Sequence, residues 1–185
     1  MFRKFLVAIL AAAMACAAFL GASMATASPG DPDLPSWVPA AALAKTSVSQ
    51  QDQIAINNLI PSQEAGRLGI SPGSFNNARV LTNTELGSLY VIPGRSGLCL
   101  ALSSRAVSCT SIGSAKSSSK VLAALLVAND SGQLVGGGLL DRDNRSVAID
   151  RKDGSRVSAT DTPGGFMVGS GAGLHTGDAV RVEAN

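Results

Sequence analysis

The chain has few of the side chains that carry catalysis or bind nucleic acid. It contains one histidine, His175, together with three Cys, one Trp, one Tyr and five Phe. Lys and Arg number 15 against 13 Asp and Glu, an excess too small to indicate a surface for a phosphate backbone. We therefore expect no nucleic-acid partner, and a core filled by aliphatic side chains and Ala.

Charge is also missing from most of the first 27 residues. Arg3 and Lys4 precede an uncharged apolar run over residues 5–20, and the segment ends in small residues at Ala25-Thr-Ala27. A positive start, a short apolar run and an A-x-A site are the parts of a secretory signal peptide. We expect cleavage between Ala27 and Ser28, a secreted or extracytoplasmic protein, and no membrane contact after cleavage.

Two alternatives exist for this segment. Residues 5–27 carry no charge, so without cleavage they could form a membrane anchor, which needs about 18 apolar residues. In a lipoprotein, Cys16 would be acylated after cleavage at Ala15, but Ala13-Met-Ala15 lacks the Leu that normally precedes such a cysteine. Cys16 is better explained as an apolar residue of the signal.

Cleavage would leave a neutral chain of about one domain. It removes two of the 15 basic residues and no acidic residue, so 13 of each sign remain. The basic pI of the whole chain, about 8.6, therefore does not indicate an acidic partner.

The two remaining cysteines fall in a predicted hairpin. The residues on either side of Ser104 alternate with the two-residue period of strands. A turn there places Ala101 opposite Val107 and Cys99 opposite Cys109, with Cβ atoms about 4.5–5.5 Å apart, which a disulfide can close at a non-hydrogen-bonded pair. Closing this loop would stabilise the fold by about 2.8 kcal/mol. A zinc or redox site is disfavoured because the spacing matches neither C-x-x-C nor a metal motif.

Three regions follow from the distribution of Pro, Gly and apolar residues. Residues 1–27 are the signal, and residues 28–77 are a Pro/Gly/Ser-rich lead-in with one short helix at about 50–60, capped by Ser49 and ended by Pro61. We expect residues 61–78 to form a loop. Residues 78–185 form a β domain. The predicted fold class is mainly β, an antiparallel sandwich or barrel-like meander with one short N-terminal helix.

Nine strands are predicted in the β domain from alternation and from turn signals such as Gly132 and Gly154. The continuously apolar residues 121–128 predict a central strand buried on both faces. Gly136-Gly-Gly138 within a strand predicts a bulge or the close approach of another backbone. The predicted strands cover residues 79–82, 88–92, 98–102, 107–112, 121–128, 134–140, 146–150, 156–159 and 165–168.

Part of the β domain resembles a known group of proteins. The segments Ser88-Leu-Tyr-Val-Ile-Pro-Gly94 and Gly97-Leu-Cys-Leu100, followed by a second Cys, are similar to exported β-rich proteins of high-GC Gram-positive (actinobacterial-type) bacteria. The resemblance covers about residues 78–170 and departs from the group's pattern at Gly138-Leu-Leu-Asp-Arg-Asp143. It implies export, the disulfide and a β fold. The group has no assigned activity, so the resemblance implies no catalytic residue.

Candidate catalytic groups are sparse. A Ser-His-Asp arrangement could use His175 with Asp178, but no Gly-x-Ser-x-Gly motif occurs. Gly169-Ser-Gly-Ala-Gly173 does not match the nucleotide-binding pattern G-x-G-x-x-G, because Leu174 stands where the last glycine is required. No helix is predicted to follow it either. We expect this segment to be a flexible connection, and we expect no catalytic residue and no cofactor.

A cluster of oxygen-bearing residues is a weak metal-site candidate. Calcium favours such ligands, but the EF-hand pattern fails and neighbouring Arg and Lys residues neutralise the cluster. Solvated turns with local salt bridges are the preferred interpretation. The candidate ligands are Asp141, Asp143, Asn144, Asp150 and Asp153.

Two classes of function remain, with a third as a weaker possibility. The leading hypothesis is a non-enzymatic extracytoplasmic β module, binding or structural, whose partner is an unknown protein or an envelope component. The alternatives are a secreted hydrolase using Ser and His175, and a calcium-stabilised module.

Overall fold

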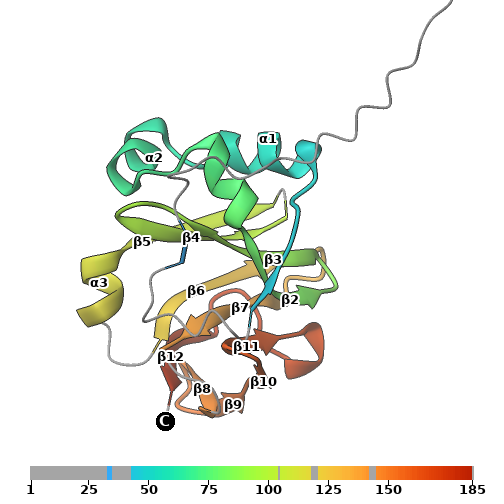
Figure 1. Ribbon diagram of the computed structural model, residues 1–185. Helices are drawn as coiled ribbons and strands as arrows, with labels where there is room; N and C mark the ends of the chain where they lie inside the picture. Colours follow the sequence, from blue (N-terminus) through green and yellow to red (C-terminus); the bar gives the residue numbers. More distant parts are fainter. Residues whose placement is uncertain (1–32, 35–42, 104, 118–120, 142–144, 185) are drawn as a thin grey trace, which may run out of the picture.

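The structure, a computed structural model, describes residues 33–34, 43–103, 105–117, 121–141 and 145–184. Its strands form three antiparallel sheets, and Figure 1 shows these sheets stacked beneath a layer of helices. The expected mainly β, antiparallel fold is therefore confirmed. The predicted signal segment 1–27, with Cys16 and the site between Ala27 and Ser28, lies outside the described residues.

Each sheet is built mostly from neighbouring hairpins. The first has the order β1 (Ala44–Lys45), β2 (Arg79–Thr84), β3 (Gly87–Pro93), β4 (Gly97–Leu102), β5 (Ala106–Ser111). The second has the order β10 (Thr160–Thr162), β11 (Gly165–Val168), β7 (Leu134–Leu140), β6 (Val121–Ala128). The third has the order β12 (Ala179–Ala184), β8 (Val147–Arg151), β9 (Arg156–Ser158).

Three apolar cores lie between the four layers. Alternate residues of one strand enter different cores: Leu89 and Val91 of β3 face the second sheet, whereas Tyr90 and Ile92 face the helices. We call the layer between the helices and the first sheet the helix-side core, that between the first and second sheets the central core, and that between the second and third sheets the third-sheet core. The inner strands β3, β4 and β7 thus bury both faces along most of their length.

The helices cover one face of the first sheet. They are α1 (Gln50–Leu59), α2 (Ser62–Leu68) and the 3-10 helix η2 (Pro72–Asn77), while α3 (Ile112–Ser117) links β5 to the second sheet. The predicted helix α1 is confirmed, and the Ser49 hydroxyl accepts a hydrogen bond from the Asp52 N–H at its start (3.1 Å). Ile56 of α1 is fully buried in the helix-side core.

The expected loop over residues 61–78 is wrong, because helix α2 and the 3-10 helix η2 occupy most of it. Pro61 ends α1 but also stands at the N-cap of α2, a position where proline's missing N–H costs little. Leu68, Ile70 and Phe75 are buried against the first sheet, so this segment belongs to the core despite its Gly and Pro content.

All nine predicted strands are present, and three further strands were not predicted. Strands β1 and β10 are two and three residues long, too short for a detectable alternation. Strand β12 has the alternating sequence Ala-Val-Arg-Val-Glu-Ala, which could have indicated it. Gly132 and Gly154, expected in tight turns, have φ values of 75° and 82°.

Strand β6 does not lie at the centre of its sheet, although its apolar sequence predicted that it would. It stands at the end of the second sheet and pairs with β7. Its side chains are apolar on both faces because one face meets the central core and the other the third-sheet core. The close approach predicted at Gly136-Gly-Gly138 is confirmed: a Cβ at Gly138 would lie 2.6 Å from the carbonyl oxygen of Ala123.

Candidate functional site

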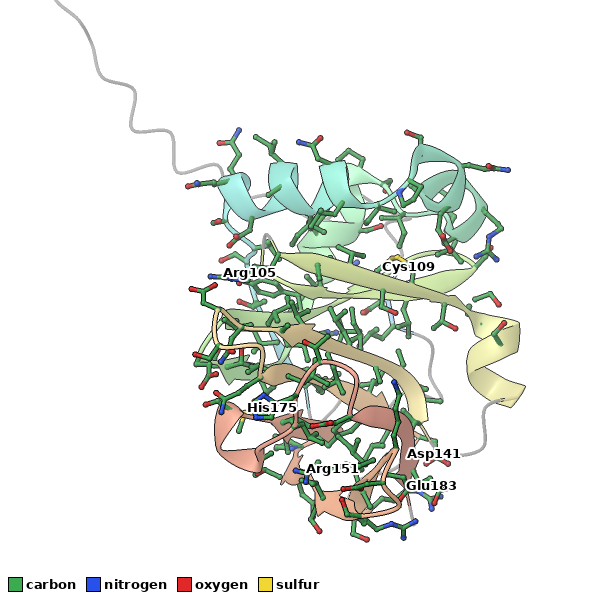
Figure 2. The ribbon with its side chains drawn as sticks, turned by 180° about the vertical axis from the view of Figure 1, so that it is seen from behind. Arg105, Cys109, Asp141, Arg151, His175 and Glu183 are labelled. Carbon is green, nitrogen blue, oxygen red and sulfur yellow. A yellow bond between two sulfur atoms is a disulfide. The ribbon has the colours of Figure 1, made fainter. Side chains whose placement is uncertain are left out.

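Cys99 and Cys109 form a disulfide. Cys99 pairs with Cys109 and Ala101 with Val107 across β4 and β5, the predicted register. The Cα atoms of the cysteines are 4.1 Å apart, which is typical of a non-hydrogen-bonded pair rather than the wider hydrogen-bonded one. The bridge faces the helix-side core and lies beneath the helices (Figure 2).

The candidate calcium ligands do not gather in one place. Asp141 pairs with Arg145 (2.8 Å) and Asp150 with Arg156 (2.7 Å), and Arg156 also reaches Glu183 (3.1 Å). Asp143 and Asn144 lie outside the described residues. Within the described part of the chain no three His, Cys, Asp or Glu side chains are grouped as metal ligands.

Asp153 belongs to its own turn. Its carboxylate accepts hydrogen bonds from the Ser155 hydroxyl (2.6 Å) and from the Ser155 N–H (2.8 Å). These two bonds, the hydroxyl first, lower the pKa of Asp153 from its ordinary value. Asp33 shows the same direction for another reason. Its partial burial raises the pKa, but the Leu34 N–H and the Arg79 guanidinium together outweigh that effect.

His175 is exposed and lies next to the hairpin that joins β6 to β7. It forms an isolated bridge with Gln133, and its backbone N–H donates to the Asp178 carboxylate (3.0 Å). Asp178 therefore caps the backbone of the turn. In a catalytic triad the carboxylate would instead orient the imidazole.

Loops from both packed sheets meet at one end of the molecule. We call this region the loop end and define it as residues 84–87, 129–133 and 169–178, which join β2 to β3, β6 to β7, and β11 to β12. Figure 2 shows His175 at this end, on the same side as Arg105 of the β4–β5 turn. This placement comes from the hairpin connections, which bring the ends of several strands to one side.

Glu85 links the three loops through its two carboxylate oxygens. Oε1 accepts a hydrogen bond from Asn129 Nδ2 (3.2 Å), and Oε2 accepts one from the Ser170 hydroxyl (2.7 Å). Bonds to a charged acceptor are stronger than those between neutral groups. One exposed carboxylate therefore ties the β2–β3 loop of the first sheet to the β6–β7 loop and to the β11–β12 connection.

The β6–β7 loop is ordered by Asn129. Its Oδ1 accepts from the N–H groups of Ser131 (3.0 Å) and Gln133 (2.9 Å), the arrangement of an Asx turn. Thr176 then joins the neighbouring loop to this one, because its N–H donates to the Gly132 carbonyl (3.0 Å). The side chain that bridges to Glu85 is thus itself held in place.

The segment 169–173, expected to be a flexible connection, contains the short 3-10 helix η3 (Ser170–Ala172). Arg151 of β8 holds its end, because Nη2 donates to the carbonyl oxygen of Gly173 (2.8 Å). Among the described residues, the Ser170 hydroxyl donates to the Glu85 carboxylate and not to the imidazole of His175.

Sequence reasoning missed Glu85, Asn129 and Ser170 as a group. Asn129 lies 44 residues after Glu85 and Ser170 lies 85 residues after it, and no sequence motif connects the three. The sole local signal was Asn129 in a turn sequence. The arrangement can offer ordered hydrogen-bonding groups and exposed carboxylates to a partner.

Among the described helices, none combines the length and the apolar character required to cross a bilayer. No protein-family model, curated protein or solved structure matches the chain. The resemblance to exported actinobacterial-type proteins, and the export itself, stay predictions.

Proposed function

We propose that the chain is an exported, non-enzymatic β module that binds a protein or envelope component outside the cytoplasm through its loop end. The observation that carries this proposal is the convergence of three loops on Glu85. Loops that are ordered before binding lose less conformational entropy when a partner docks, which favours affinity.

The chemistry of the loop end supports binding over catalysis. The imidazole of His175 is exposed, and the nearby hydroxyl of Ser170 donates to Glu85. In the hydrolase alternative the imidazole of His175 would have to accept the proton of a serine hydroxyl, whereas the Ser170 hydroxyl donates to the Glu85 carboxylate instead. The disulfide between Cys99 and Cys109 supports an oxidising compartment, where such bonds persist.

Paired variants test the binding surface. Asp130 and Ser131 are exposed at the tip of the β6–β7 loop. Asn57 and Asn58 are exposed on α1, in the helix layer and outside the loop end (Figure 1). We expect Asp130→Ala/Ser131→Ala to fail to complement a deletion of the gene, and Asn57→Ala/Asn58→Ala to complement it. Immunoblots of the exported fraction ensure equal protein levels.

Two results would overturn the proposal. Full complementation by the loop variant together with loss in the α1 variant would move the binding surface to the helices. A His175→Ala protein that folds and is exported normally, yet reproduces the deletion, would favour the hydrolase. N-terminal sequencing of the native protein tests export separately, with Ser28 as the expected first residue.

A further inference from the structure

Strand β6 leaves one edge of the second sheet without a neighbour in the described structure. It pairs with β7 and stands last in the strand order. Edge strands are usually protected by charges, Pro or short length, because their unpaired N–H and C=O groups can pair with another chain. Strand β6 has eight residues, Val-Leu-Ala-Ala-Leu-Leu-Val-Ala, and carries none of these protections.

The direction of its backbone groups follows from the hairpin that ends it. The Asn129 N–H donates to the Gln133 carbonyl (2.8 Å), whereas the Leu134 N–H donates away from β6, to the Leu174 carbonyl (2.8 Å). Hydrogen-bonded and non-hydrogen-bonded pairs alternate along an antiparallel ladder. Ala128, Leu126 and Ala124 therefore direct their N–H and C=O groups away from β7.

These outward groups make no hydrogen bond within the described residues. Figure 2 views the molecule from the side on which β6 crosses below β5, the end strand of the first sheet. The two edges differ, because one face of β5 carries Ser108 and Thr110. Strand β6 is the apolar edge on this side.

Both faces of β6 border a core that an added strand would extend. Ala123, Leu125 and Val127 pack at the margin of the central core, and Val121, Ala124 and Leu126 at that of the third-sheet core. All six are half-buried. A strand that continues both cores must be uncharged and apolar on its two faces, and β6 itself meets this requirement.

We propose that two copies of the chain associate through their β6 strands, which pair antiparallel and join the two second sheets into one. A two-fold axis at Leu125 places Ala124 opposite Leu126 of the second copy, and both residues direct their backbone groups outward. The chain that signal cleavage would leave carries 13 basic and 13 acidic residues, so its net charge does not oppose this association. The interface uses identical surfaces and closes on itself, as the commonest homodimers do.

Molar mass is the first measurement. Light scattering coupled to size-exclusion chromatography, or sedimentation velocity, should show the purified exported protein changing from monomer to twice that mass as its concentration rises. A monomer at every concentration, or a mass other than that of a dimer, would overturn the proposal. A monomer that gains mass with an extended apolar peptide would instead assign the edge to a different partner.

Ala124→Pro locates the interface. Proline at 124 removes an outward N–H and no bond to β7, which edge strands tolerate. We expect this variant to stay monomeric at concentrations where the wild type is dimeric. The matched control is Val107→Pro. Val107 of β5 lies two residues from Cys109, which forms a non-hydrogen-bonded pair with Cys99. Because the two kinds of pair alternate along the ladder, Val107 also directs its N–H away from β4. We expect the control to dimerise like the wild type.

Hydrogen exchange on the wild type gives an answer that does not depend on a variant's folding. The amides of Ala124, Leu126 and Ala128 should exchange more slowly as protein concentration rises, whereas the Val107 amide should not change. A dimer in which these three amides exchange at the monomer's rate, or which Ala124→Pro leaves intact, would place the interface elsewhere and refute the proposal.

Discussion

The ring of Phe166 occupies the space that a side chain at position 138 would need. Gly138 of β7 is the register partner of Phe166 in β11, and an added Cβ would lie 2.6 Å from Phe166 Cζ. Phe166 is fully buried in the third-sheet core. The glycine in β7 therefore leaves room for the ring of Phe166 against this strand.

Gly138→Ala should lower the free energy of unfolding. The added methyl overlaps Phe166 on one side and the Ala123 carbonyl on the other, and the backbone contact cannot move independently of β6. We expect a loss of about 1–3 kcal/mol, the usual cost of overpacking a core. Urea denaturation with an unchanged m-value measures it.

Gly66→Ala is the matched control for this substitution. A Cβ at Gly66 meets nothing within 4 Å, and the residue lies inside helix α2. Alanine is favoured over glycine in a helix, so the control should gain about 0.5–1 kcal/mol. Equal effects at positions 66 and 138 would contradict the packing argument.

The disulfide should contribute mainly by constraining the unfolded chain. Replacing both Cys99 and Cys109 by Ala should lower the free energy of unfolding by about 2.8 kcal/mol in the chain-entropy model. Reducing the wild-type protein should produce a similar loss. Thermal melts with and without reductant measure it, and the double variant, which has no bridge, should be insensitive to reductant.

Peptide mapping checks the same bond chemically. Without reductant, the peptides containing Cys99 and Cys109 should elute as one linked species. Alkylation of both thiols in the native, unreduced protein would show that the bridge does not form in solution.

The relationship between Cys99 and Cys109 could be predicted because it is local. The period of two on either side of Ser104 sets the register, and one turn brings the strands together. The same holds for most strands, whose bounds were found within about two residues. Residues 61–78 could not be assigned this way, because Leu68, Ile70 and Phe75 are buried by packing on the first sheet rather than by a periodic pattern.

Strand order and long-range contacts required the structure. The apolar run of β6 predicted a central strand buried on both faces, whereas the strand ends its sheet and most of its residues are half-buried against two cores. The sequence could not distinguish contact with two cores from pairing with two neighbouring strands. The contact between Glu85 and Ser170 spans 85 residues and depends on how two sheets are stacked. No local pattern contains that information.

The link between Glu85 and Ser170 should be measurable as a coupling energy. We expect Glu85→Ala and Ser170→Ala to be non-additive by about 0.5–1 kcal/mol, since an exposed bond to a charged acceptor is weakened by solvent. A double-mutant cycle in urea denaturation gives the coupling. Gln63→Ala, exposed on α2 in the helix layer, should combine additively with Glu85→Ala.

The effect of pH on the β8–β9 turn can be tested at Asp153. Hydrogen bonds from the Ser155 hydroxyl and N–H lower the pKa of this carboxyl below its ordinary value of 3.8. Because the folded pKa is the lower one, the stabilisation is fully present above the unfolded pKa and is lost as pH falls through the folded pKa. An NMR titration of the carboxyl carbon should show this low pKa in the wild type. Ser155→Ala should raise it toward 3.8, whereas Ser158→Ala, exposed on the neighbouring strand β9, should leave it unchanged. An Asp153 pKa that is equal in wild type and Ser155→Ala would show that the hydroxyl does not hold this carboxylate in solution.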